Sequence, residues 1–339
     1  MLNKLTNGVT CFSHAKDVDG LSSASIVRMA TGASVVLVDY NNIVDKLDSL
    51  SEAKEVYICD IGLNRTLAIP FLNEIKRITG FASVHFIDHH PLDEKLSKQL
   101  IGLGVDLYHS LEESCSVLAY TKLSGHLKDG AHILASYGAV TDYMDDGPSA
   151  KKLISRFDRQ FILLESTLLT YALLGSGDDL SFRSNIVEEL SELKFPHEIH
   201  DILKYSHQGL KKISGLMIEV AEKGVKRNWI AVMEAKEASA GILANLLIGA
   251  FDTPIGVSYR LLKDKDLCEV SIRGSYDSKF DLGKIVTQIT EMTGGIGGGH
   301  KKASGARIPS KSLNEFLDMI ELKLDMASGP SRQGSARFC

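Results

Sequence analysis

Three apolar runs in the first 90 residues each lead into acidic or histidine side chains. Runs of this kind are typical of buried strands in a parallel sheet. Ligands of such sheets collect outside the carboxyl ends of the strands. Carboxylates and imidazoles pack poorly in an apolar core, but they bind divalent metal ions well. We therefore expect a shared crevice. Residues 9–12 lead into His14, Asp17 and Asp19, residues 55–59 into Asp60, and residues 83–87 into Asp88, His89 and His90.

Each group also has a purely structural interpretation. Asp17 or Asp19 could be the N-cap of the helix that begins near residue 20, because Asp accepts hydrogen bonds from the amides of a first turn. Asp60 could cap the turn after its strand. A cap explains one aspartate, but not two together with His14. Two adjacent imidazoles after a carboxylate have no routine structural role, so the Asp88-His89-His90 triplet favours function.

A further acidic residue, Asp142, interrupts an apolar helical pattern over residues 130–144. It should face inward and need a cation as partner, whereas we interpret Asp145 and Asp146 as capping or solvated residues. Mixed Asp and His ligation argues against an all-oxygen Mg²⁺ or Ca²⁺ site, and the absence of cysteine ligands argues against structural zinc. We predict two Mn²⁺ ions, with Mg²⁺ as the alternative. Two such ions can activate a shared water and neutralise the leaving oxygen of a phosphoryl group.

The elements that must position these residues form an α/β protein of two lobes. Short apolar runs alternate with helical segments up to about residue 145, which predicts βαβ units and a parallel sheet. Residues 150–224 read as helices without a convincing strand, and a second, smaller α/β lobe begins near residue 228. The predicted boundaries are 1–149 for the first domain, 150–226 for a helical connector, 227–326 for the second domain, and 327–339 for a disordered tail.

Length and composition set the remaining limits. The 339 residues are enough for two cores, and the net charge of −5 leaves no global basic field for gripping duplex nucleic acid. The five cysteines are scattered without CxxC spacing, so we expect reduced, buried thiols. No apolar stretch is long enough for a membrane span, and no signal peptide is apparent. We expect a soluble, cytoplasmic protein with no membrane partner.

The order HxxDxDG, strand-Asp, DHH and an inward Asp resembles the DHH phosphoesterase superfamily. That superfamily includes RecJ-type exonucleases, oligoribonuclease/pAp-phosphatase enzymes, cyclic-dinucleotide phosphodiesterases and manganese pyrophosphatases. The resemblance implies that Asp60 bridges two metals, that Asp88 supports the site, and that His90 lies beside the scissile phosphate. Only Ala15 and Lys16 separate His14 from Asp17, where many members have three residues. By the same resemblance, one metal would be held by His14, Asp17 and Asp60, and the other by Asp19, Asp60, His89 and Asp142.

A glycine-rich run over residues 294–302, which we expect to form a loop between a helix and a strand, ends in His300 and two lysines. Glycines let backbone amides approach an anion closely, so this run favours phosphate binding over a flexible surface loop. Arg273 ends an apolar run, where a guanidinium could bind phosphate in bidentate fashion or could simply be solvated. The set SIRGS, helix, GGIGGGHKKASGA resembles the DHHA1 domain. That resemblance implies substrate contacts from Arg273, Gly298, Gly299 and His300, and it makes pyrophosphate an unfavoured substrate.

The function predicted from these motifs is a Mn²⁺-dependent phosphoesterase. It would hydrolyse single-stranded or short oligonucleotides to nucleoside monophosphates, with Asp88 and His90 in catalytic roles and two metals activating water. One alternative is a phosphatase or phosphodiesterase for small nucleotides such as pAp or a cyclic dinucleotide. Another is a non-catalytic replication scaffold, which would have no reason to keep all the acidic residues. A homodimer, and replication or repair partners, stay open at this point.

Overall fold

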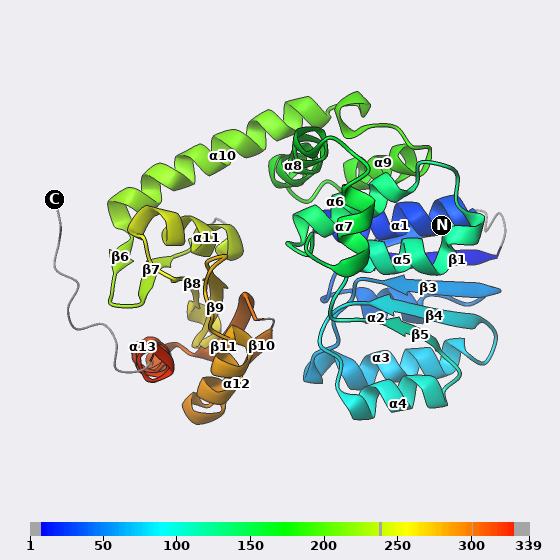
Figure 1. Ribbon diagram of the computed structural model, residues 1–339. Coiled ribbons are helices and arrows are strands. Elements are labelled where there is room, and N and C mark those ends of the chain that lie inside the picture. The colour runs from blue at the N-terminus through cyan, green and yellow to red at the C-terminus, as the bar shows by residue number, and fades with distance from the viewer. Residues whose placement is uncertain (1–7, 237–238, 300, 329–339) are drawn as a thin grey trace. The chain divides into compact units, whose positions relative to one another are not determined.

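The computed structural model describes residues 8–236, 239–299 and 301–328, and it divides into two compact units at residues 211 and 212 (Figure 1). The first unit contains a five-stranded, all-parallel sheet in the order β2-β1-β3-β4-β5. The prediction of an α/β protein with an N-terminal parallel sheet is confirmed. Its strands are β1 (Val9–His14), β2 (Ser34–Val38), β3 (Glu55–Cys59), β4 (Ser83–Asp88) and β5 (Asp106–His109).

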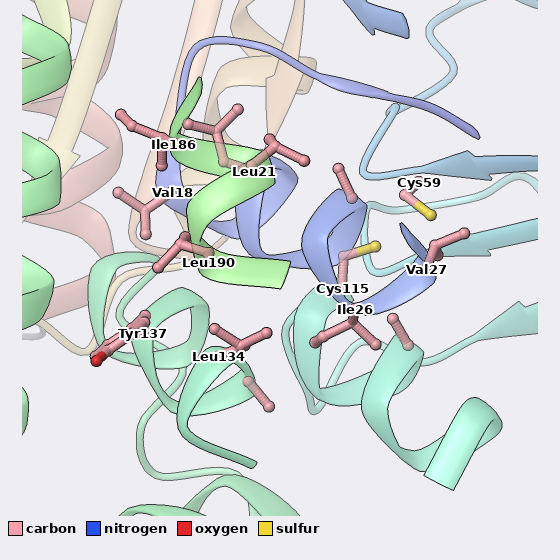
Figure 2. Close-up of a cluster of buried hydrophobic side chains, with 14 of the residues drawn as sticks. Val18, Leu21, Ile26, Val27, Cys59, Cys115, Leu134, Tyr137, Ile186 and Leu190 are labelled. Atoms are coloured by element: carbon pink, nitrogen blue, oxygen red, sulfur yellow. The ribbon is translucent and has the colours of Figure 1, made fainter. Parts of the chain in front are cut away.

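Helices cover both faces of this sheet, because successive residues of each strand point to opposite faces. Cys11 and Cys59 point into the core formed with α1, α5, α6, α8 and α9, part of which is drawn in Figure 2. Phe12 and Ile58 point into the opposite core, formed with α2, α3 and α4. The helices of this unit are α1 (Val18–Thr31), α2 (Ile43–Asp48), α3 (Arg65–Ile78), α4 (Glu94–Gly102), α5 (Cys115–Leu123), α6 (His132–Thr141), α7 (Pro148–Ile154), α8 (Arg159–Ser176) and α9 (Leu180–Ser191).

The helices that the sequence suggested as a connector share a core with the first sheet. Leu169 on α8 and Ile186 on α9 are buried with Leu21 of α1. Helix α10 (Ile202–Lys223) follows, and the division between the units falls inside it, whereas the second domain was expected to begin at residue 227. The sequence analysis did not predict α2 and α4, which are only six and nine residues long.

The second unit contains a six-stranded mixed sheet in the order β10-β11-β9-β8-β7-β6. Among the described strands of this second sheet, only the β7–β8 pair is parallel. Helices α12 and α13 pack in one core with the sheet, and α11 packs in another. The elements are β6 (Val225–Lys226), β7 (Ile230–Glu234), α11 (Ala240–Phe251), β8 (Ile255–Leu262), β9 (Leu267–Gly274), α12 (Leu282–Thr293), β10 (Ile296–Gly299), β11 (Ala303–Pro309) and α13 (Leu313–Ser328).

Two further sequence expectations can be compared with the described residues. Cys11, Cys59, Cys115 and Cys268 are free and buried, as predicted for core thiols, and Cys339 lies outside the described residues. Within the described parts of the chain, every helix is too short or too polar to cross a bilayer. Most of the tail that was expected to be disordered, residues 329–339, also lies outside them.

Candidate metal centre

The acidic and histidine residues lie at the carboxyl ends of β1, β3 and β4, which are neighbours in the sheet. The chain crosses to the other face of the sheet between β1 and β3, since α1 packs on one side and α2 and α3 pack on the other. In open α/β sheets this topological switch point is where ligands bind. The strand order therefore places the three groups at the position where a crevice is expected.

The segment between β1 and α1 fixes two aspartates by different means. Asp17 is the N-cap of α1: its Oδ1 accepts from the Gly20 amide at 2.9 Å, while its Oδ2 lies 2.6 Å from His14 Nδ1. The cap interpretation thus holds for Asp17, and the same side chain also faces His14. Asp19 is buried and accepts hydrogen bonds from the amides of Cys115 (2.7 Å) and Ser116 (2.9 Å) in the first turn of α5. The helix N-terminus favours a charged Asp19 carboxylate at this point.

Asp60 occupies the centre of the group. Its φ of 60° lies in the left-handed region, which few residues other than glycine and asparagine adopt. Its Oδ1 is 3.3 Å from His89 Nε2, and its Oδ2 is 3.7 Å from His14 Nδ1. Asp60 is 1% exposed, and Oδ2 has no hydrogen-bond partner among the described residues. A buried carboxylate oxygen without a hydrogen-bond partner costs folding free energy, and a cation bound there would remove that cost.

The two histidines of the triplet point to different partners. His90 Nδ1 is 2.9 Å from Asp88 Oδ1, and the His90 amide donates to Asp88 Oδ2 at 3.1 Å, so Asp88 fixes the His90 ring. His89 Nε2 lies 3.3 Å from Asp142 Oδ2 and 3.9 Å from Asp19 Oδ2. Asp142 is the C-cap of α6 rather than a residue of its interior, because the helix ends at Thr141.

Three overlapping groups of ligand atoms could each hold a metal ion. Within each group the candidate atoms lie within 4.8 Å of one another. Asp60 and His89 each belong to two groups, which suits a centre in which the ions share ligands. All six residues predicted as metal ligands come together in this way, together with His90. The groups are His14, Asp17 and Asp60; Asp19, His89 and Asp142; and Asp60, His89 and His90.

The electrostatics of the site also fit a cation. Burial raises the pKa of Asp19 to about 6, with a further contribution from the Asp60 carboxylate. Burial and the nearby Asp19 likewise raise the pKa of Asp142 well above its ordinary value. Burial lowers the pKa of His89, but the Asp60, Asp19 and Asp142 carboxylates outweigh it and raise that pKa to about 10. Carboxylates this close destabilise one another's charged forms. A divalent ion bound among them would offset this repulsion, which protonation relieves when no ion is bound.

The sequence reasoning missed residues that adjoin this centre. Asp39 and Tyr40 follow β2, so this strand also ends in polar side chains, and the signal used for the other three strands could have found them. Asp39 Oδ1 is 3.9 Å from His14 Nε2. Tyr40 Oη is 3.4 Å from His90 Nε2. Glu113 is a second omission: it is buried and accepts from the amides of Ser149 and Ala150 at the start of α7.

In the second unit, the predicted phosphate-binding residues lie on two strands. Arg273 is near the end of β9, and its guanidinium occupies the space beside Gly241 in the first turn of α11, where an added Cβ would come within 2.6 Å of Nη2. Gly298 and Gly299 are in β10, with φ of 156° and 143°. His300 lies outside the described residues. The roles of these four residues in substrate binding stay predictions.

The sequence suggested that the glycine-rich run is a loop, but part of it is a strand. Residues Ile296–Gly299 form strand β10, which pairs antiparallel with β11. Gly297 packs so closely on α12 that an added Cβ would lie 2.8 Å from Thr290 and 2.9 Å from Val286. Lys302, expected to help bind an anion, instead donates to the backbone carbonyls of Ser275, Tyr276 and Ser278. Part of this motif therefore serves the hairpin and its packing.

Comparison with known proteins finds a family that the second unit resembles. Residues 228–325 match the family described as the DHHA1 domain. An uncharacterized protein of Methanocaldococcus jannaschii is 31% identical over 99 residues, which are 28% of this chain. The aligned part is only 22% of that relative's own length.

Several solved structures share the fold of nearly the whole chain. A DHH-domain structure from a family of ribosomal proteins has a TM-score of 0.69 at 15% identity, covering 93% of this chain and 86% of that one. The pGpG-specific phosphodiesterase PggH of Vibrio cholerae has a TM-score of 0.56 at 12% identity, covering 94% and 99%. RecJ of Thermus thermophilus, in complex with Mn²⁺, has a TM-score of 0.59 at 14% identity, covering 94% and 52%. The second unit is thus similar to the DHHA1 family, and nearly the whole chain shares the fold of these three structures.

Proposed function

We propose that this protein is a phosphodiesterase that requires divalent metal ions, with Mn²⁺ the preferred ion, and that it releases nucleoside monophosphates from single-stranded or short oligonucleotides. The observation that carries the proposal is the set of three overlapping ligand groups at the switch point of the sheet, centred on a buried Asp60 whose Oδ2 has no hydrogen-bond partner among the described residues.

Each side chain has a defined task in this proposal. His14, Asp17 and Asp60 would hold one ion, and Asp19, Asp60, His89 and Asp142 would hold the other. When bound, the ions supply Lewis acidity and lower the pKa of water. Asp88 orients the His90 ring through the 2.9 Å contact at Nδ1, which leaves Nε2 directed to the Tyr40 hydroxyl. That edge of the ring can donate to a non-bridging oxygen of the substrate phosphate.

The second unit supplies a phosphate-binding surface in this proposal. Arg273 offers a planar guanidinium suited to two phosphate oxygens. The positive φ of Gly298 and Gly299 lets the β10 backbone take a course closed to other residues, so its amides can meet an anion without side chains in the way. His300 completes the proposed set. A surface of this kind would select nucleotides by their phosphate ends.

A small nucleotide is the second candidate substrate, and a specific observation favours it. The chain matches 99% of the length of the pGpG-specific phosphodiesterase but only 52% of the length of the Thermus RecJ chain. The fold of this chain is thus matched along its length by an enzyme whose name specifies a dinucleotide, pGpG. Substrates of two to five nucleotides are the ones that we expect to turn over best.

The test of the substrate is a Mn²⁺ and Mg²⁺ assay on labelled 2-, 5- and 20-mer RNA and DNA, together with pGpG, pAp and cyclic di-AMP.

The test of the site is a substitution. We expect Asp142→Asn to lower kcat/KM by about 100-fold or more, because loss of a direct metal ligand should lower activity at least as much as loss of an outer-sphere partner. Asp145→Asn is the matched control, since its side chain is exposed three residues away. Equal activity of these two variants would overturn the proposed site. Turnover of pAp or cyclic di-AMP alone would exclude the oligonucleotide substrate, and no turnover of any substrate would favour a scaffold.

A further inference from the structure

The outward edge of the His89 ring contacts a methionine. His89 Nδ1 lies 3.1 Å from the Sδ atom of Met144, two residues beyond Asp142. His89 is 4% exposed and Met144 is partly buried. Histidines that bind metals usually donate their second ring N–H to a carboxylate or a carbonyl oxygen. A thioether sulfur is a weaker acceptor, but it is an acceptor.

The position of this sulfur bears on which nitrogen of His89 carries the proton. The Nε2 atom faces the carboxylates of Asp60, Asp142 and Asp19. A metal among these groups needs the Nε2 lone pair, so the neutral ring must hold its proton on Nδ1. The partner of one ring nitrogen sets the state of the other. The sulfur of Met144 lies where it can accept that Nδ1 proton.

Backbone hydrogen bonds hold the main chain of Met144 on both sides. Tyr143 has a φ of 57°, so the chain reverses sharply just after Asp142. The Met144 amide then donates to the Ala139 carbonyl at 2.9 Å, and the Gly147 amide donates to the Met144 carbonyl at 3.3 Å. Helix α7 starts at the next residue and is capped by the buried Glu113. Asp142 and Met144 are therefore set by one short, anchored turn.

We propose that Met144 is a positioning residue, which fixes His89 in the Nδ1–H form and so presets its Nε2 atom for the metal shared with Asp19 and Asp142. This inference rests on the proposed metal-dependent function. The turn that carries Asp142 would then have a second task, which is to orient His89.

The test compares Met144→Leu, which keeps the volume and removes the acceptor, with Met144→Gln, which restores an acceptor through its amide oxygen. Mn²⁺ binding is measured by the loss of the free-ion signal in electron paramagnetic resonance. We expect Met144→Leu to weaken one class of Mn²⁺ site by about tenfold, the lower end of outer-sphere effects because sulfur accepts weakly. The other class should be unchanged, and Met144→Gln should recover at least half of the loss on a logarithmic scale. Met292→Leu, at a 68% exposed position of α12, is the control for methionine loss.

A spectroscopic readout separates positioning from general damage. With ¹⁵N-labelled histidine and a diamagnetic metal, the His89 Nδ1–H resonance should be protected from exchange in the wild type and in Met144→Gln, and should exchange faster in Met144→Leu. Wild-type affinity at both classes of site in Met144→Leu overturns the inference while leaving the proposed function intact. A wild-type protein that binds no Mn²⁺ overturns the proposed function itself. Equal weakening in the Leu and Gln variants also counts against an acceptor role.

Discussion

Gly138→Ala is a sharp test of how the site is held, because this glycine on α6 lies against one of the proposed ligands. A Cβ at residue 138 would meet Ser116 Oγ at 2.1 Å and Asp19 Oδ1 at 2.2 Å. Ordinary non-bonded contact is about 3.5 Å, so Asp19 and Ser116 would have to retreat by about 1.3 Å or α6 would have to move away. The first movement disturbs the two amide hydrogen bonds that fix Asp19 on α5, and the second displaces Asp142 at the end of α6.

The size of the effect follows from that displacement. Overpacking a core position costs about 1–3 kcal/mol of folding stability, and we expect urea denaturation of Gly138→Ala to give a loss within that range. A misplacement of about 1 Å in a catalytic group can cost about 100-fold in rate. We therefore expect kcat/KM to fall by about 100-fold and Mn²⁺ affinity to fall at the site that includes Asp19.

The matched control is Gly102→Ala at the last residue of α4, where an added Cβ meets nothing within 4 Å. It should stabilise the protein by about 0.5 kcal/mol, through the smaller entropy of its unfolded chain, and leave activity unchanged. Normal activity and normal Mn²⁺ affinity in Gly138→Ala would refute the claim that Asp19 is held where the structure places it and is needed there.

Two further outcomes follow from the charges. The pKa values of His89 (about 10) and Asp19 (about 6) are raised, so the metal-free folded protein binds more protons than the unfolded chain. The stability that these two groups contribute is therefore present at low pH, and it is lost as pH rises through those values. EDTA-treated protein should thus melt lower at pH 8.5 than at pH 6, with Mn²⁺ raising Tm more at pH 8.5; an equal Mn²⁺ effect at both pH values would contradict proton displacement. Arg273→Lys, which loses the bidentate fork, should raise KM for a dinucleotide about tenfold with little change in kcat, and an unchanged KM would remove Arg273 from the binding surface.

The clustering of the candidate ligands was predictable because its signal is local. His14, Asp60 and His89 each follow an apolar run, and the rule that parallel strands present their carboxyl ends at one edge brings them together without further information. The same rule applies to Asp39 after β2, but the sequence analysis did not apply it to that strand. The predicted role of Asp142 needed one more step, the mismatch between a charged residue and an apolar helical pattern.

Residues whose importance comes from distant pairing could not be predicted. Glu113 caps a helix that begins 35 residues later, and Met144 gains its position from a turn that depends on left-handed backbone at Tyr143. The glycine-rich run was expected to be a loop because glycine disfavours strands. Its pairing with β11 and its packing on α12 outweigh that preference, which is a tertiary effect.

The left-handed backbone at Asp60 decides which substitutions can be used to study the protein bound to its substrate. Asparagine adopts this conformation readily, while alanine is strained in it. Asp60→Asn therefore removes the central negative charge without reshaping the turn between β3 and α3, and Asp60→Ala would change both at once. A substrate-trapping form, suitable for crystallising the protein with an intact oligonucleotide, should accordingly be built on asparagine.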